Sequence, residues 1–143
     1  MDRLRIALLP TIILFSLSVF TVSKVAAQAS KQQTPWVAPA EADQLLNPLA
    51  NDKAVLEKGK ALYTAECVVC HGTNGNAETN IAESLEQKPK NFTKEDFLSQ
   101  TDGAIFWKLS EGRGLMQPFK TMLTEEEIWS VVSYVKVLAA AED

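Results

Sequence analysis

The chain has 143 residues, a net charge of −4 and a single histidine. This length predicts one domain, and the acidic balance argues against nucleic acid as a partner. The two cysteines and the histidine all fall between residues 67 and 71, so the reactive side chains are concentrated in one short segment.

The N-terminus predicts a targeting segment. Residues 1–5 are short and basic, residues 6–22 are largely apolar, and Ala27-Gln28-Ala29 matches a small-x-small cleavage site. We therefore expect residues 1–29 to be a signal peptide that directs the protein to the periplasm or another exported location. The alternative is an uncleaved membrane anchor, although the apolar run is slightly short for a spanning helix. Loss of three basic residues and one acidic residue would change the net charge from −4 to −6, which favours a partner with a basic patch.

The rest of the chain divides into a lead and a domain. Residues 30–50 contain several prolines among alanines, and this composition predicts a flexible lead segment. The domain is expected over residues 51–143. Its first helix is predicted from about Asp52 into the cysteine pair, with the apolar positions and Gly59 on one face. A glycine in mid-helix costs about 1 kcal/mol relative to alanine, so Gly59 is either tolerated or needed for the close approach of another helix.

The second half of the chain predicts further helices. Residues 77–91 show no clear periodicity and are expected to be mostly loop. After them, Thr93 and Asp96 resemble a capping box, with Phe92 and Phe97 at the positions of a hydrophobic staple.

Two longer helices follow. Asp102 is predicted to cap a helix over residues 103–111. Thr124 and Glu127 form another capping box, at the start of a final helix that carries an apolar stripe to about Ala140. Since every predicted element is a helix, the expected fold class is all-α.

The segment from Cys67 to His71 reads C-x-x-C-H, the attachment signature of a c-type haem. Each thiol adds across one vinyl group of the porphyrin, the two-residue spacing lets both reach neighbouring vinyls, and the histidine offers a nitrogen to iron. A redox dithiol would call for a βαβ context, but no strand pattern lies near the motif. A structural zinc site needs four ligands, whereas two cysteines and one histidine supply only three. A disulfide or a chance match remains as an alternative. The predicted cofactor is one haem c per chain, held by Cys67 and Cys70 with His71 as an axial ligand.

The second axial ligand is predicted from the methionines. Met/His ligation is one of the usual haem arrangements, and the sequence holds no second histidine. Met1 is lost with the signal peptide. Met116 lies in the centre of a loop that contains glycine and proline, whereas Met122 directly precedes a capped helix. This placement favours Met116 as the ligand, with Met122 or an open iron site as the alternatives.

From residue 47 onward, the chain resembles the class I (mitochondrial-like) single-haem cytochromes c, most closely the bacterial periplasmic members. The resemblance is carried by segments 67–71, 88–92, 102–108, 112–120 and 123–129. It implies an all-α cytochrome c fold, with about four to five helices and loops wrapped round one covalently bound haem that cycles between Fe(II) and Fe(III). It also implies a contact of Gly59 with Trp129 or Tyr134.

The chain departs from the family pattern at two positions. Family members usually have proline directly after the axial methionine, whereas here Gln117 stands between Met116 and the proline. Many relatives also have a Gly-Pro pair whose proline carbonyl accepts the N–H of the ligating histidine, and here Thr79-Asn80 stands at the equivalent place.

The leading functional hypothesis is an exported electron carrier that is not itself an enzyme, because His71 and Met116 would fill both axial positions of the haem iron. Its expected partners are redox proteins, such as a respiratory complex, an oxidase or a dehydrogenase. Membrane contact is expected only if residues 1–29 stay uncleaved. One alternative is the haem-bearing subunit of a larger periplasmic dehydrogenase or respiratory complex. Another is a haem sensor or peroxidase with an open iron site.

Overall fold

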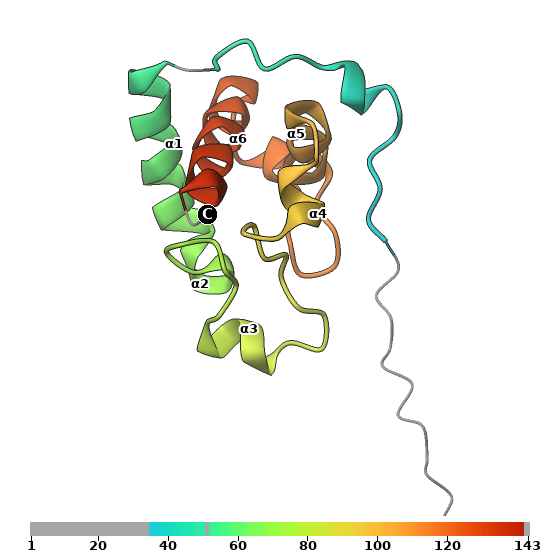
Figure 1. Cartoon of the computed structure of the whole chain (residues 1–143), viewed down its shortest axis with the longest axis vertical. Coiled ribbons are helices and arrows are strands. Elements are labelled where there is room, and N and C mark those ends of the chain that lie inside the picture. The colour runs from blue at the N-terminus through green and yellow to red at the C-terminus, as the bar shows by residue number, and fades with distance from the viewer. Residues whose placement is uncertain (1–34, 51, 142–143) are drawn as a thin grey trace, which may run out of the picture. The chain divides into compact units, whose positions relative to one another are not determined.

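The computed structural model describes residues 35–50 and 52–141 of the chain. The predicted signal peptide lies outside the described residues. Within them the secondary structure is helical, apart from one isolated bridge between Arg113 and Met116, and the predicted all-α class is confirmed (Figure 1). The elements in chain order are η1 (Ala42–Gln44), α1 (Lys53–Glu66), α2 (Val68–His71), α3 (Asn80–Ser84), α4 (Glu95–Leu98), α5 (Asp102–Glu111), η2 (Phe119–Thr121) and α6 (Glu125–Ala140).

The described helices differ greatly in length. Helices α2, α3 and α4 are single turns, whereas α1 and α6 have 14 and 16 residues. None of the helices in the described ranges is long and apolar enough to cross a membrane. The two longest described helices, α1 and α6, pack against each other, and the shorter elements are arranged around this pair.

Helices α1 and α6 lie side by side (Figure 1), and their backbones approach closely at Gly59. A β-carbon at this position would overlap the carbonyl group of Ser130 and would lie 2.9 Å from Cβ of Tyr134. Close approach of the two backbones therefore explains the mid-helix glycine. The expected contact with Tyr134 is confirmed, whereas Trp129 stacks on Phe106 with ring centroids 4.1 Å apart.

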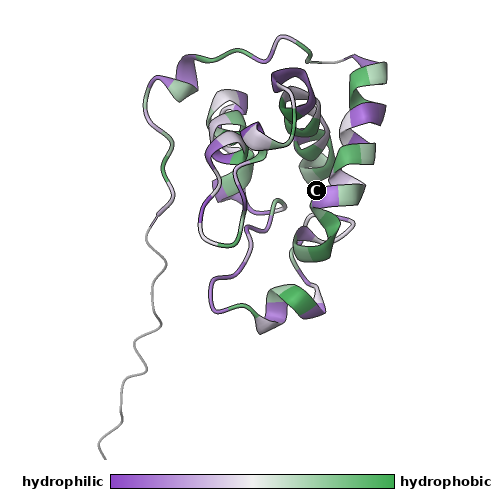
Figure 2. Cartoon of the chain, turned by 180° about the vertical axis from the view of Figure 1, so that it is seen from behind, coloured by the Kyte–Doolittle hydropathy of each residue, from purple (hydrophilic) through white to green (hydrophobic). Residues whose placement is uncertain are grey.

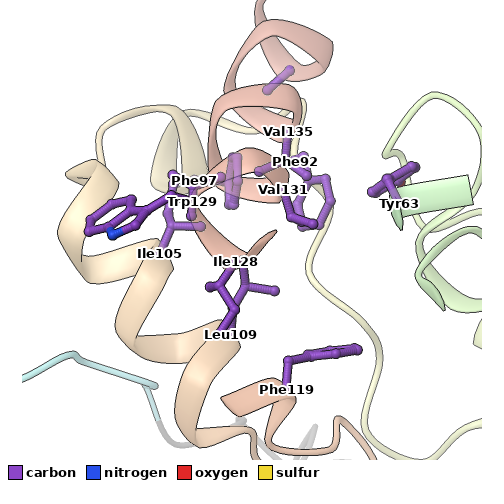
Figure 3. Packing of buried hydrophobic residues seen from close by; sticks show 12 residues of the cluster. Tyr63, Phe92, Phe97, Ile105, Leu109, Phe119, Ile128, Trp129, Val131 and Val135 are labelled. Carbon is purple, nitrogen blue, oxygen red and sulfur yellow. The ribbon is translucent and has the colours of Figure 1, made fainter. Parts of the chain in front are cut away.

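The core is built around α6. This helix begins with the predicted capping box, since Thr124 and Glu127 exchange side-chain to backbone hydrogen bonds. Hydrophobic residues follow along most of its length, whereas α1 alternates hydrophilic and hydrophobic residues (Figure 2). Val132 of α6 is fully buried. Aromatic side chains such as Phe92 and Phe97 pack near Val131 and Val135 of the same helix (Figure 3).

The starts of α4 and α5 differ from the sequence prediction. Thr93 does not cap α4, because both its backbone N–H and its hydroxyl donate to the Asn91 side chain, which leaves Lys94 as an N-cap without a side-chain hydrogen bond. The predicted staple pair, Phe92 and Phe97, does stack, with centroids 4.4 Å apart.

The cap of α5 is shifted by one residue from the prediction. Thr101, not Asp102, is the N-cap, and its hydroxyl accepts from the backbone N–H of Ala104 at 3.0 Å. The predicted loop over residues 77–91 contains the single turn α3, which the Thr79 hydroxyl caps in the same way.

The lead segment packs on the domain over its described part. Ala38 and Ala42 are buried against Ala104 of α5, and the Asn47 amide donates to both Asp102 and Ser133. Small side chains let this part of the predicted lead lie flat against α5, and its polar groups find partners there. The flexibility of residues 30–50 stays a prediction.

Candidate functional site

A cavity of about 1290 Å³ opens between the short helices, α5 and α6. All four residues that the sequence predicts as haem site residues line it, namely Cys67, Cys70, His71 and Met116. Met122, the alternative ligand, is not among the lining residues and has 50% of its surface exposed. The structure thus brings together two segments that are far apart in the sequence.

The cysteines are presented by the junction of α1 and α2. Cys67 ends α1 and also begins α2, and its carbonyl accepts from the backbone N–H groups of Cys70 and His71 at 3.1 and 2.9 Å. This tight turn brings both thiols and the imidazole to one cavity.

Neither of the two thiols is in a disulfide in the structure. Burial, with a smaller contribution from the neighbouring Glu66 carboxylate, raises the pKa of Cys67 to about 12. Since a redox dithiol works through a thiolate with a lowered pKa, this environment argues against the dithiol interpretation of the motif.

His71 is oriented by two contacts. Its Nδ1 donates to the Lys90 carbonyl at 3.1 Å, and its ring stacks on Phe92 with centroids 4.6 Å apart. Burial lowers the pKa of His71, which favours the neutral ring. A neutral imidazole whose Nδ1–H is held by a carbonyl has Nε2 available as a metal ligand.

The carbonyl that holds His71 could not be identified from the sequence. The residues at the expected equivalent place do not provide it, because Thr79 caps α3 and its hydroxyl donates to the Val69 carbonyl. Lys90 lies 19 residues beyond the histidine, directly after Pro89, and no local pattern connects the two positions.

Met116 sits in a turn between α5 and η2. Arg113 and Met116 exchange two backbone hydrogen bonds, at 2.7 and 3.0 Å, which close the turn. Gly112 and Gly114 have φ of +65° and +60°, a region that favours glycine. The pair of glycines in the sequence therefore shapes the loop that brings the partly buried methionine to the cavity.

The inner walls of the cavity are mostly apolar and aromatic. Figure 3 shows Phe119 and Tyr63 standing apart from the cluster that includes Ile105, Leu109 and Val131, and all five line the cavity. Protein interiors are normally close-packed, so an apolar-walled space of this size indicates a bound group. Two thiols, an imidazole and a thioether around such a space fit a covalently attached haem.

A family profile described as "Cytochrome C oxidase, cbb3-type, subunit III" matches residues 54–135. The chain belongs to the cytochrome c family. The matched range begins after the lead segment and contains all four predicted site residues. Covalently attached haem c and a role as a haem-based electron carrier follow from this membership and agree with the sequence prediction.

Similar proteins support the assignment of this chain to the cytochrome c family. Cytochrome c6 of Parathermosynechococcus lividus is 31% identical over 91 residues, which cover 61% of this chain and 94% of that protein. Cytochrome c6 of Bryopsis maxima is 34% identical over 85 residues, covering 56% of this chain and 88% of that protein. The cbb3-type cytochrome c oxidase subunit CcoP of Azospirillum brasilense is 30% identical over 99 residues, but the match covers only 33% of that longer protein against 68% of this chain.

Solved structures show the same fold. The KustC0563 c-type cytochrome superposes with a TM-score of 0.50 at 33% identity, over 56% of this chain and 95% of that chain. A chain of the Kuenenia stuttgartiensis reducing HAO-like protein complex Kustc0457/Kustc0458 gives a TM-score of 0.57 at 25% identity, over 64% of this chain and 46% of that chain.

Proposed function

We propose that Cys67 and Cys70 hold the haem of this cytochrome through thioether bonds and that His71 and Met116 are the two axial ligands of its iron. The observation that carries the proposal is the convergence of all four side chains on one cavity. Met116 follows His71 by 45 residues, so only the fold could bring them together. Met122, the nearest competitor, lies at the surface.

The bound haem supplies a one-electron couple between Fe(III) and Fe(II). The residues of the chain hold and shield it. The Lys90 carbonyl fixes the orientation of the His71 ring, and apolar side chains of the cavity wall such as Leu109 and Phe119 would pack against the haem. If His71 and Met116 both bind the iron, no coordination site would be left for a substrate, and the protein would act as an electron carrier rather than as an enzyme on its own.

The absorption spectrum tests the ligand set. The purified protein should show thioether-linked haem, and Met116→Ala should abolish the far-red band of a methionine bound to Fe(III). Met122→Ala is the matched control and should keep that band. Loss of the band in the Met122 variant, with the Met116 variant unchanged, would refute the assignment.

The proposed carrier is exported and meets redox proteins at the cavity mouth. Val37, Val69 and Leu115 all line the cavity and are 77%, 59% and 79% exposed. Exposed apolar groups from three segments around one opening form a surface on which another protein can dock. The predicted signal peptide supports export to the periplasm, where covalent haem is attached.

A second candidate is an electron-transfer subunit of a larger assembly. It is favoured by the match to an oxidase subunit and to a component of an HAO-like complex. The chemistry of the haem would be the same, but the chain would remain bound to a catalytic partner. Size-exclusion chromatography of the native protein from membranes and from the soluble fraction distinguishes the two. A stable large complex favours the subunit, and a species of about the size of the single chain favours the free carrier.

A further inference from the structure

Lys108 is a cation in the wall of the haem cavity. It lies in the last turn of α5, one residue before Leu109, and lines the cavity together with the predicted haem ligands. It is only partly exposed, unlike most lysines of the described ranges.

The hydrogen bond of Lys108 is made to another residue that lines the cavity. Among the described residues its side chain donates to the Gln100 side chain, a neutral acceptor that precedes α5. A lysine in the last turn of a helix commonly interacts with the helix C-terminus. Here the ammonium group reaches back past the start of the helix instead, so helix capping does not explain its position.

The charged groups around Lys108 leave its charge only partly compensated. The pKa of Lys108 is lowered, first by burial and then by the positive charge of Lys90, and Asp43 opposes this effect. Lys90 itself pairs with Asp96, and Asp43 accepts from the Thr101 hydroxyl at 2.7 Å. No salt bridge joins Lys108 to a carboxylate in the part of the chain that the structure describes.

We propose that Lys108 is an internal cation that stabilises the reduced haem and so raises the midpoint potential of the protein. This inference rests on the proposed function. In each cycle a reduced redox protein would give one electron to the bound haem, whose iron would go from Fe(III) to Fe(II), and an oxidised redox protein would later take that electron. Reduction would lower the net charge of the haem by one unit. A fixed cation in the cavity wall therefore favours the reduced haem over the oxidised haem. A partly buried charge is screened by salt much less than a surface charge, and the effect should therefore persist at physiological ionic strength.

The test compares the midpoint potentials of holoprotein variants in a spectroelectrochemical titration at low and high salt. Lys108→Gln should lower the potential at both salt concentrations, whereas Lys108→Arg, which keeps the charge, should stay near the wild-type value. Gln100→Glu leaves the lysine in place but puts a carboxylate against it, and should also lower the potential. Lys60→Gln removes an exposed lysine of α1 that does not line the cavity, and it should have little effect at high salt.

The outcomes separate this inference from the proposed function. If the wild-type protein lacks thioether-linked haem, both the proposed function and the role of Lys108 are overturned. If the haem spectrum is normal, a Lys108→Gln potential equal to that of the wild type overturns the role of Lys108 alone, as does an equal shift in the Lys60 variant. If Lys108→Gln fails to incorporate haem, the midpoint potential of Gln100→Glu is the test instead. A Gln100→Glu potential equal to that of the wild type overturns the inference.

Discussion

Replacing Gly59 with alanine should destabilise the protein although alanine is the better helix former. Helix propensity alone would stabilise the variant by about 1 kcal/mol. The added methyl, however, would overlap the Ser130 carbonyl oxygen, and would lie 2.7 Å from its carbonyl carbon and 2.9 Å from Cβ of Tyr134. These are backbone or Cβ atoms, which no rotamer change can move. To restore normal contacts near ~3.5 Å, α1 and α6 would have to separate, and overpacking of this kind costs about 1–3 kcal/mol or more.

Because the overlap is with backbone, the overpacking cost should lie at the upper end, about 3 kcal/mol. Less the gain of about 1 kcal/mol in propensity, the net loss in the free energy of unfolding is about 2 kcal/mol, or roughly 10 °C in Tm for a domain of this size. Thermal and denaturant unfolding of the holoprotein, followed by circular dichroism, measure it. Ala61→Gly is the matched control, because Ala61 is an exposed residue of the same helix; it should lose about 1 kcal/mol through propensity alone. If Gly59→Ala proved as stable as the wild type, the helices could not be as close as described.

Two further predictions concern Tyr63 and Glu127. The Tyr63 hydroxyl donates to the Gly72 carbonyl at 2.6 Å inside the protein; Tyr63→Phe should cost about 1–3 kcal/mol in denaturant unfolding, and an unchanged midpoint would mean that the carbonyl finds another donor. Hydrogen bonds from Thr124 lower the pKa of Glu127, so the stability it contributes is complete above its unfolded-state pKa and is lost as the pH falls through the lowered folded-state pKa. Glu127→Gln should lower stability at neutral pH and flatten this acid dependence; a Tm that falls with acid as steeply as in the wild type would contradict the assignment.

The long helices could be predicted because their signals are local. Thr124 and Glu127 are three residues apart, and the reciprocal hydrogen bonds of a capping box need no other part of the chain. The same holds for Asp52, whose side chain accepts from the first backbone N–H groups of α1. The presence of a haem was predictable for a similar reason, since the C-x-x-C-H motif is one tight turn.

At the start of α4, hydrogen bonds to Asn91 prevent the capping that the sequence pattern predicts. Thr93 and Asp96 have the spacing of a capping box, but the Asn91 side chain accepts from both polar groups of Thr93. Short polar side chains often form such local turns. The sequence pattern contains both possibilities, and in the structure Thr93 joins the local turn while the predicted staple pair still stacks.

The packing of the lead segment on α5 could not be predicted from its composition. Prolines and alanines are typical of loose linkers, but small side chains also allow a backbone to lie close against a helix. A β-carbon at Gly103 would overlap the Ala42 carbonyl, so this glycine of α5 leaves room for the lead. Ala42 and Gly103 are 61 residues apart in the sequence, and no local pattern indicates that they are in contact.

Residues that face a cofactor are the hardest to predict, and Lys108 shows why. Periodicity separates residues that contact the protein core from residues that contact water, and α5 follows this rule with Ile105 and Leu109. A side chain that faces a cavity belongs to neither class, because its neighbour is not encoded in the chain. Read by pattern, Lys108 is a solvated surface lysine, but the fold places it in the wall of the cavity that His71 and Met116 also line. Covalent attachment identified the haem from five residues, whereas its electrostatic environment depends on contacts that only the folded chain creates.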